Sequence, residues 1–279
     1  AAGGRAAEVT GRLLQVGFPL YRAGLDGYRI GQWMPIVVEL RAGGPTHFEG
    51  LLRVEQYDTD GDIVRTDRPV ALTAGLQPAR RIWLYALAGS RGLSRGLVVQ
   101  VVDRSGRTVA RLSKGPGTIL YPDEQFVLDI SPRPITQLAE LSESEDHASG
   151  LVAGRISPGL LPDWWAGLEM VQAIVWDEAD PAQLTRRQID AVLGWIRRGG
   201  RLIIAAGRTA PAVASSSLAP ALPVTVAGTL QTKRLRALVL RYAGWSRPLS
   251  LRRPTICARA GPVSYTHLRA HETSLHLVC

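Results

Sequence analysis

In the first half of the chain, apolar residues form short runs that are separated by glycine, aspartate and proline. Asp60-Gly61 and Asp103–Gly106 carry the residue types of tight turns. Short strands at this spacing favour an all-β, immunoglobulin-like sandwich. We expect its strands at 13–18, 33–40, 51–57, 82–88, 97–102, 108–112 and 126–130.

The pattern changes in the second half, where continuous apolar runs replace the short ones. Val171–Trp176 ends in acidic residues, and Arg201–Ala206 is a second run of the same kind. Continuous runs are typical of buried parallel strands. With a helix between them they form one β-α-β unit, whose crossover we expect to be right-handed. The predicted fold class of this half is α/β.

The helix between these two strands has a start signal and a stop signal. Thr185 and Gln188 form a capping box, in which the threonine oxygen accepts from a backbone amide and the glutamine reaches back. Gly199-Gly200 can adopt the left-handed backbone conformation that ends a helix. Between them lies an apolar stripe at helical spacing, made of Ile189, Val192, Leu193 and Ile196.

Pro132-Arg133-Pro134 separates the two patterns. We therefore expect two domains, a β-sandwich over 1–132 and an incomplete α/β domain over 133–262. The polar stretch Ser142–Asp146 is interpreted as a loop within the second domain.

The end of the chain, Val263–Cys279, has a different interpretation. Val263–Thr273 can be written as one open frame that resembles the transposon end and adapter of sequencing libraries, and Leu277–Cys279 fits the continuation of that adapter. We interpret 263–279 as not native and exclude it from fold reasoning. The native gene is then expected to continue beyond Pro262, and this tail to be poorly packed or to fill a gap left by missing strands.

The tail carries most of the histidine and cysteine residues of the chain, which are the usual zinc ligands. His267 and His271 have the i,i+4 spacing of a zinc pair, and Cys279 could complete a set. If the tail is adapter, only His47, His147 and Cys257 remain. We therefore predict no metal site and no cofactor.

The chain is basic, with a formal net charge of +9 and a pI of about 10.2. Its arginines are scattered, and no aromatic stripe is interleaved with them, so we expect an arginine-rich surface rather than nucleic-acid binding. Nucleic-acid binding stays an alternative that rests on charge alone. No apolar run has the length of a membrane span.

Two acidic motifs resemble sites of known chemistry. Ala173–Asp180 resembles the acidic box of DEAD-type helicases, but the chain has no G-x-x-x-x-G-K-[ST] phosphate loop. Asp177 is then expected to end a strand, and Asp180-Pro181 to begin the approach to the helix. Asp58–Asp62 matches part of a calcium loop, but Pro69 stands where a glutamate is required, which favours a hairpin turn.

Trp164-Trp165 and Cys257 are the remaining candidates for binding or catalysis. Exposed tryptophan pairs stack sugars or anchor partners, but here we favour packing of a helix start onto a sheet. Cys257 lacks a glycine-flanked elbow and a credible histidine, so we interpret it as a buried small residue.

Three segments carry a family resemblance: 161–168 (LPDWWAGL), 171–177 (VQAIVWD) and 184–204 (LTRRQIDAVLGWIRRGGRLII). Together they resemble the class I glutamine amidotransferase-like domain of large bacterial cell-envelope proteins. Tyr28–Leu40 is similar to the opening of the immunoglobulin-like sandwich that precedes this domain in those proteins. The resemblance implies a flavodoxin-like, three-layer α/β domain after the sandwich, an extracytoplasmic location and a membrane anchor in a missing C-terminal segment.

Catalytic amidotransferases need a cysteine on a strand-to-helix elbow, a histidine and a glutamate. No cysteine precedes Cys257, and no histidine follows the strand that ends before Gly207 at the matching place. We therefore assign no catalytic residue. The hypothesis is a non-catalytic binding or assembly protein whose partner is an unknown protein or envelope component.

The rival hypothesis is a hydrolase or amidase with a site that does not use cysteine. The loops after the two α/β strands lie at the carboxyl edge of the sheet, where ligand sites form in α/β folds. Asp177, Glu178 and Arg208 would line that crevice. The simpler interpretation of these three residues is helix capping and surface solvation, which we favour.

Overall fold

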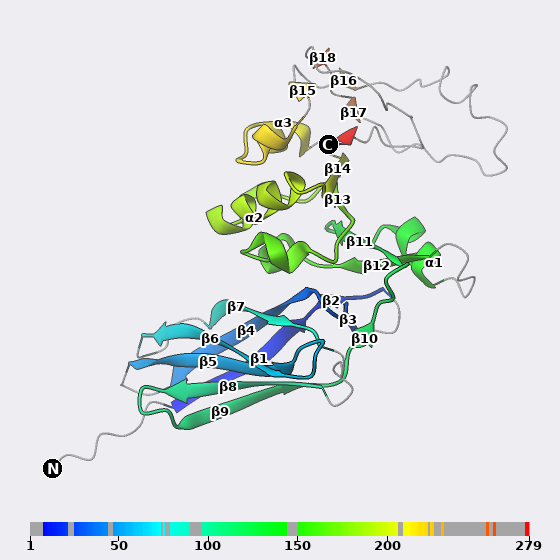
Figure 1. The fold of residues 1–279 in the computed structure, drawn as a ribbon. Helices are drawn as coiled ribbons and strands as arrows, with labels where there is room; N and C mark the ends of the chain where they lie inside the picture. The colour runs from blue at the N-terminus through cyan, green and yellow to red at the C-terminus, as the bar shows by residue number, and fades with distance from the viewer. Residues whose placement is uncertain are drawn as a thin grey trace.

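A computed structural model describes most of the chain before residue 223 and isolated pieces after it (Figure 1). The described residues are 8–21, 25–43, 47–73, 75, 79–89, 96–143, 150–205, 209–222, 224–225, 230–231, 255–256, 259–260 and 277–278.

The N-terminal part is a β unit of two antiparallel sheets. One sheet has the order β1-β4-β7 and the other β6-β5-β8-β9. The strands of the first sheet are β1 (Glu8–Val16), β4 (Trp33–Gly43) and β7 (Arg80–Leu87). Those of the second are β5 (Phe48–Tyr57), β6 (Ile63–Leu72), β8 (Leu97–Asp103) and β9 (Thr108–Lys114).

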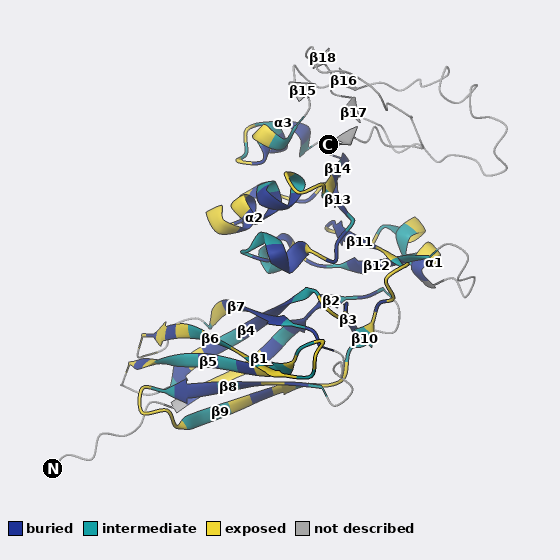
Figure 2. Cartoon of the chain, in the orientation of Figure 1, coloured by how far each residue is buried: buried dark blue, intermediate teal, exposed yellow. Residues whose placement is uncertain are grey.

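The two sheets of the β unit face each other across one apolar core, as in a sandwich (Figure 2). Val38 and Leu84 from the first sheet and Leu52 and Val99 from the second are almost fully buried in it. Alternation along each strand places these side chains inward and the charged ones outward. The predicted β-rich N-terminal half is therefore confirmed.

The predicted turn at Asp60-Gly61 is confirmed as the end of the β5–β6 hairpin. Oδ1 of Asp58 accepts hydrogen bonds from the backbone amides of Asp60, at 3.0 Å, and Asp62, at 2.9 Å. Gly61 has a φ of 91°, which an L side chain rarely adopts. The carboxylate of Asp58 therefore organises a turn.

A second main sheet follows, in the order β12-β11-β13-β14-β19, and we call residues 125–222 the parallel-sheet unit. Its first four strands are mutually parallel: β11 (Gln125–Ile130), β12 (Leu151–Arg155), β13 (Ala173–Asp177) and β14 (Arg201–Ala205). Numbered along the chain, their order is 2-1-3-4, which is the order of flavodoxin-like doubly wound sheets.

Helices lie on both faces of this sheet. Helix α1 (Thr136–Glu143) covers one face, where Val127, Val175 and Leu138 pack together. Helix α2 (Arg186–Ile196) covers the other face and contributes to the larger core. The two helices and the sheet form three layers.

The expectation that 126–130 closes the sandwich is wrong. Strand β11 pairs in parallel with β12 and β13, so it is a central strand of the second sheet. Phe126 and Leu128 point into the core on the α2 side, whereas Val127 points into the core on the α1 side. Because the strand is buried on both faces, its apolar run is continuous. The domain boundary expected at 132 therefore lies before Gln125.

The β-α-β unit predicted from the second half is confirmed. Strands β13 and β14 pair in parallel, with Ile174 opposite Leu202, and α2 lies between them in the chain. The capping box is present: the Gln188 amide donates to Oγ1 of Thr185, at 3.3 Å, and the Thr185 amide donates to the Gln188 side chain, at 2.9 Å. Gly199 ends the turn after α2 with a φ of 99°.

Short segments connect the β unit to the parallel-sheet unit. β3 (Asp26–Tyr28) lies between β2 (Phe18–Pro19) and β10 (Thr118–Ile119) in a small sheet. Phe18 and Leu20 leave the β unit and enter the core of the parallel-sheet unit, where Phe18 contacts Phe126. The two units therefore share buried side chains.

The tryptophan pair lies at the junction of the two units, next to the short helix η3 (Trp165–Leu168). The Trp164 ring meets Trp33 and Tyr85 of the β unit edge-on, with centroids 5.3 and 5.2 Å apart. Trp165 stacks instead under the guanidinium of Arg198, 3.8 Å from the ring centroid. The prediction that these tryptophans pack is confirmed.

A polar cluster accompanies the aromatic contacts at the junction. The Tyr85 hydroxyl donates to Oδ1 of Asp163, at 2.7 Å, and accepts from the Asp163 amide, at 2.9 Å. Arg68 of β6 donates to the other Asp163 oxygen, at 3.2 Å. Burial, and next the negative charge of Asp163, raise the pKa of Tyr85 well above its usual range.

The remaining elements are short helices and strands, and all of them except η2 follow β13 in the chain. They are η2 (Pro158–Leu160), η4 (Pro181–Gln183), α3 (Ala210–Ala214), η6 (Ala219–Ala221), β15 (Val224–Thr225), β16 (Leu230–Gln231), β17 (Thr255–Ile256), β18 (Arg259–Ala260) and β19 (Leu277–Val278). β19 pairs antiparallel with the outer edge of β14. Within the described ranges, no helix has the length and apolar character needed to cross a membrane.

Candidate functional site

The parallel sheet has a topological switch point between β11 and β13. The chain leaves β11 through α1 toward β12 on one side, and leaves β13 through α2 toward β14 on the other. In sheets of this kind, ligands bind outside the carboxyl ends of the strands at this point. The side chains at the ends of β11, β12 and β13 therefore make up the candidate site.

Asp177, the last residue of β13, lies at the switch point as expected and is half-buried. Burial raises the pKa of its carboxyl above the usual range, and the negative charges of Glu178 and Asp129 raise it further. The Asp177 carboxyl therefore holds its proton more tightly than an ordinary aspartate does.

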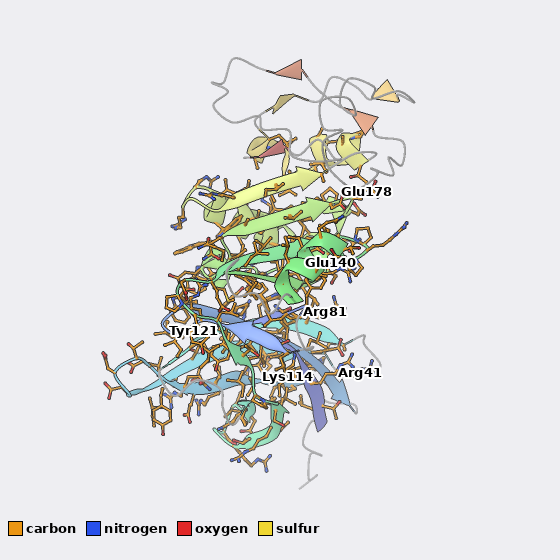
Figure 3. The ribbon with its side chains drawn as sticks, turned by 90° about the vertical axis from the view of Figure 1, so that its right-hand side faces the viewer. Arg41, Arg81, Lys114, Tyr121, Glu140 and Glu178 are labelled. Carbon is orange, nitrogen blue, oxygen red and sulfur yellow. The ribbon has the colours of Figure 1, made fainter. Side chains whose placement is uncertain are left out.

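Glu178 follows directly and is exposed at the same edge, beyond the ends of β13 and β14 (Figure 3). Its φ of 49° is the one positive value for a non-glycine residue in the described parts of the chain. Its amide donates to the carbonyl of Ala205, at 3.3 Å, which holds the turn against β14. Arg208, the third predicted residue, lies outside the described residues.

Asp129, which the sequence interpretation missed, is the buried acid of the site, with a side chain 0% exposed. Its Oδ2 accepts hydrogen bonds from the Tyr21 hydroxyl and from the Ile135 amide, the latter at 3.3 Å. Its Oδ1 has no hydrogen-bond partner among the described residues. One signal could have found it: an aspartate inside an apolar strand is costly to bury unless its neighbours compensate.

Tyr21 reaches the site from the segment between β2 and β3. Its pKa is raised well above the usual range, first by burial and then by the hydrogen bond to Asp129 and the charge of that residue. The Tyr21 amide donates to the Ala153 carbonyl of β12, at 3.0 Å. The connection between the units is thereby fixed to the edge of the parallel sheet.

Arg155, at the end of β12, is directly opposite Asp129 in the strand register. One of its terminal nitrogens donates to the Ser131 carbonyl, at 2.9 Å, while its buried Nε has no partner within the described part of the structure. The Ser131 hydroxyl donates to the Arg133 carbonyl. The loop after β11 is therefore held by the neighbouring strand β12 and by its own local hydrogen bond.

A cleft of about 600 Å³ opens beside these groups, a size within the range of ligand pockets. Its lining is mainly apolar and includes the charged residues Arg155, Glu178 and Asp180. The lining residues are Pro19, Ser131, Pro132, Arg155, Ile156, Ser157, Pro158, Leu160, Glu178, Ala179, Asp180 and Gln183. The cleft therefore offers both apolar surface and charged groups to a ligand.

The other sequence candidates play structural parts or lie elsewhere. Asp180 precedes η4 and its carboxylate accepts from the Ala182 amide, at 2.9 Å, as expected of a residue that begins the approach to α2. Cys257 and the tail histidines lie outside the described residues. No group of three or more acidic, histidine or cysteine side chains suited to a metal ion occurs in the described part of the chain.

Residues 16–114 match the model of a domain of unknown function, DUF8726, within the β unit. No curated protein matches the chain. Similar solved structures include a β-glucosidase from Listeria innocua, with 12% identity over 42% of this chain and 17% of that one, and a TM-score of 0.27. Another is a Paenibacillus sp. cycloisomaltooligosaccharide glucanotransferase complexed with cycloisomaltoheptaose, with 12% identity over 70% of this chain and 28% of that one, and a TM-score of 0.28. The chain spans less than a third of the length of either structure, and likeness at this level carries no argument about activity.

Proposed function

We propose that the chain is a non-catalytic binding or assembly protein of the bacterial cell envelope. In this proposal an immunoglobulin-like sandwich precedes a flavodoxin-like domain that is related to class I glutamine amidotransferases and has lost their chemistry. The strand order of the parallel sheet and the three-layer packing support the relation. The resemblance of 161–168 and 184–204 to that family supports the assignment to the envelope.

One observation carries the non-catalytic part of the proposal. At the switch point, where α/β enzymes place reactive groups, Asp129 is fully buried and binds Tyr21 and Ile135. Arg155 likewise holds the Ser131 carbonyl. The hydrogen bonds of Asp129 and Arg155 connect the two units and hold the start of α1 in place. Their role in this proposal is therefore structural. A rigid body with an open cleft beside the junction suits the binding of a partner.

The proposal is tested by assaying the purified chain for release of ammonia from glutamine and for cleavage of chromogenic amides and esters. The expected result is no turnover above the blank. Turnover that is lost in Asp177→Asn and kept in Asp190→Asn would overturn the proposal. Asp190 is a suitable control because it is an exposed residue of α2 that pairs with Arg186, at 3.2 Å.

A hydrolase or amidase is the second candidate, and one observation favours it. Asp177 is half-buried at the switch point with a raised pKa, beside a second carboxylate, and perturbed acids of this kind cluster at active sites. The same assay decides between the candidates, because a hydrolase that uses Asp177 as its acid or base loses activity in Asp177→Asn.

The location is tested on the full-length native gene product. In cells whose outer barrier is made permeable, an added protease is expected to cleave the protein while a cytoplasmic marker stays intact. Cleavage of both proteins only after lysis would contradict an extracytoplasmic location.

A further inference from the structure

The chain contains two aspartate-glycine pairs, and the structure places them in opposite surroundings. Asp26-Gly27 lies in β3, whereas Asp60-Gly61 lies in the turn of the β5–β6 hairpin. In such a pair the glycine has no side chain to hinder attack of its backbone nitrogen on the preceding carboxyl. The chain has no asparagine, so any isoaspartate formed in it comes from aspartate.

The pair in the hairpin turn is open to reaction. The Asp60 side chain is exposed, and among the described residues its backbone amide forms a hydrogen bond while its carboxyl forms none. Gly61 has a φ of 91°, and a Cβ added there would meet nothing within 4 Å. The Gly61 amide donates to the Asp58 carbonyl at 3.3 Å, just beyond the usual range of about 2.7–3.2 Å. The Gly61 nitrogen therefore has open space around it and only a weak hydrogen bond to lose.

The pair in β3 is enclosed. Asp26 is 7% exposed, and its Oδ2 accepts from the Val16 amide, at 2.7 Å, and from the Lys114 ammonium. The backbone of β3 is paired with β2 on one side and with β10 on the other. A Cβ added at Gly27 would lie 2.7 Å from the Leu20 side chain. The Asp26 carboxyl is thus held by its partners, and neither it nor the Gly27 nitrogen can move without breaking the sheet.

We propose that Asp60-Gly61 is a site at which the folded chain forms isoaspartate spontaneously, while the fold protects Asp26-Gly27. In the first step the Gly61 nitrogen attacks Cγ of the protonated Asp60 carboxyl. The N–Cγ bond forms, and the carboxyl hydroxyl leaves with the amide proton as water, which gives a cyclic succinimide. Water then adds to the main-chain carbonyl carbon of Asp60, and the bond from that carbon to the Gly61 nitrogen breaks. The chain now runs through Cγ, and no oxidant or other reactant is consumed.

The product changes the turn, because it inserts one carbon into the backbone between residues 60 and 61. Oδ1 of Asp58 holds the turn through the amides of Asp60, at 3.0 Å, and Asp62, at 2.9 Å. The Asp62 amide lies beyond the inserted carbon, so we expect it to lose this bond and to exchange its hydrogen faster. The freed main-chain carboxylate is the group that isoaspartyl methyltransferases modify, which makes the turn a substrate for that class of enzyme. This inference is independent of the function proposed above.

The test compares the folded full chain with the same chain unfolded in urea, both incubated in mildly acidic buffer. Trypsin releases the two pairs in separate peptides, 23–29 and 54–65. Electron-transfer fragmentation then locates isoaspartate within each peptide. In urea we expect both pairs to convert, whereas in the folded chain position 60 should convert at least several-fold faster than position 26. No isoaspartate at position 60 of the folded chain, or as much at position 26, would overturn the proposal.

Two glycine variants separate attack by the Gly61 nitrogen from a general loosening of the fold. Gly61→Ala places a methyl group beside that nitrogen, so we expect isoaspartate at position 60 to form several-fold more slowly. Gly106→Ala is the control, because Gly106 has a similar φ of 85° and equally open space but does not follow an aspartate. It should leave the rate at position 60 unchanged. An unchanged rate in Gly61→Ala, or an equal reduction in both variants, contradicts the proposal.

Discussion

At the scale of single residues, Asp163 at the junction is the acid from which we expect a large contribution to stability. Asp163 accepts hydrogen bonds from the buried Tyr85 hydroxyl and from Arg68. Asp163→Ala leaves that hydroxyl without its acceptor, and we expect a loss of about 1–3 kcal/mol in the free energy of unfolding. Urea denaturation followed by circular dichroism measures it.

Asp190→Ala is the matched control for this substitution. Asp190 is an exposed acid whose ion pair with Arg186 lies on the surface of α2. Its removal is expected to change stability by less than about 0.5 kcal/mol. Equal losses in the two variants would show that the junction cluster adds nothing to the fold.

The residue scale also shows where sequence reasoning reached the site and where it did not. Asp177 and Glu178 could be predicted because they follow an apolar strand directly, and strand ends gather at one edge of a parallel sheet. Asp129 and Tyr21 could not, because their contact joins residues 108 positions apart. Pairing between distant segments depends on the strand order, which local patterns leave open.

At the scale of elements, the cap of α2 carries a prediction that distinguishes two roles of one side chain. Thr185→Ala removes the N-cap oxygen and should cost about 1 kcal/mol. Gln188→Ala should cost more, because the 1% exposed Gln188 side chain also donates to the Leu161 carbonyl, at 2.7 Å. Thermal unfolding of both variants gives the order.

Arg187→Ala, an exposed neighbour in the same helix, serves as the control for the loss of a long side chain. A smaller cost for Gln188→Ala than for Thr185→Ala would mean that the Leu161 carbonyl finds another donor.

The helices and strands differ in how well the sequence pattern alone predicts them. The β13-α2-β14 unit was predictable because caps, helical spacing and continuous strands all agree. Strand β11 was assigned to the wrong unit, because a strand of six residues can have the same apolar pattern in a β-sandwich and in a parallel sheet. β2 was not expected in the second core, since a two-residue strand has no periodicity.

The edge strand β12 shows how closely the connecting segment approaches the parallel sheet. A Cβ added at Gly154 would lie 2.3 Å from the Pro19 carbonyl oxygen, which is backbone and cannot move aside easily. Gly154 also bridges Leu20. Gly154→Ala is expected to lower the midpoint of thermal unfolding and to increase hydrogen exchange at 18–21. Gly115→Ala controls for glycine loss alone, because an added Cβ there meets nothing within 4 Å and its backbone is not left-handed.

At the scale of the whole molecule, the two units are expected to unfold together. Phe18 and Leu20 leave the β unit and lie in the core of the parallel-sheet unit. In the opposite direction, Trp164 of the parallel-sheet unit packs against Trp33 and Tyr85 of the β unit. Two units that pack side chains into each other in both directions stabilise each other, so we expect their transitions to coincide in the unmodified chain.

Trp164→Ala tests this coupling. The substitution removes the ring that contacts both Trp33 and Tyr85, and a loss of about 1.5–3 kcal/mol is expected from the apolar area exposed. Because that loss falls on the contact between the units, unfolding should separate into two transitions, one for each unit. The unfolding curves from circular dichroism and from the fluorescence of the remaining tryptophans, recorded on the same sample, would then no longer coincide.

Tyr121→Ala is the control, because Tyr121 is an aromatic residue 66% exposed on the surface. A single transition in Trp164→Ala, shifted no further than in the control, would mean that the shared strand β2 and the Asp163 cluster couple the units without the tryptophan.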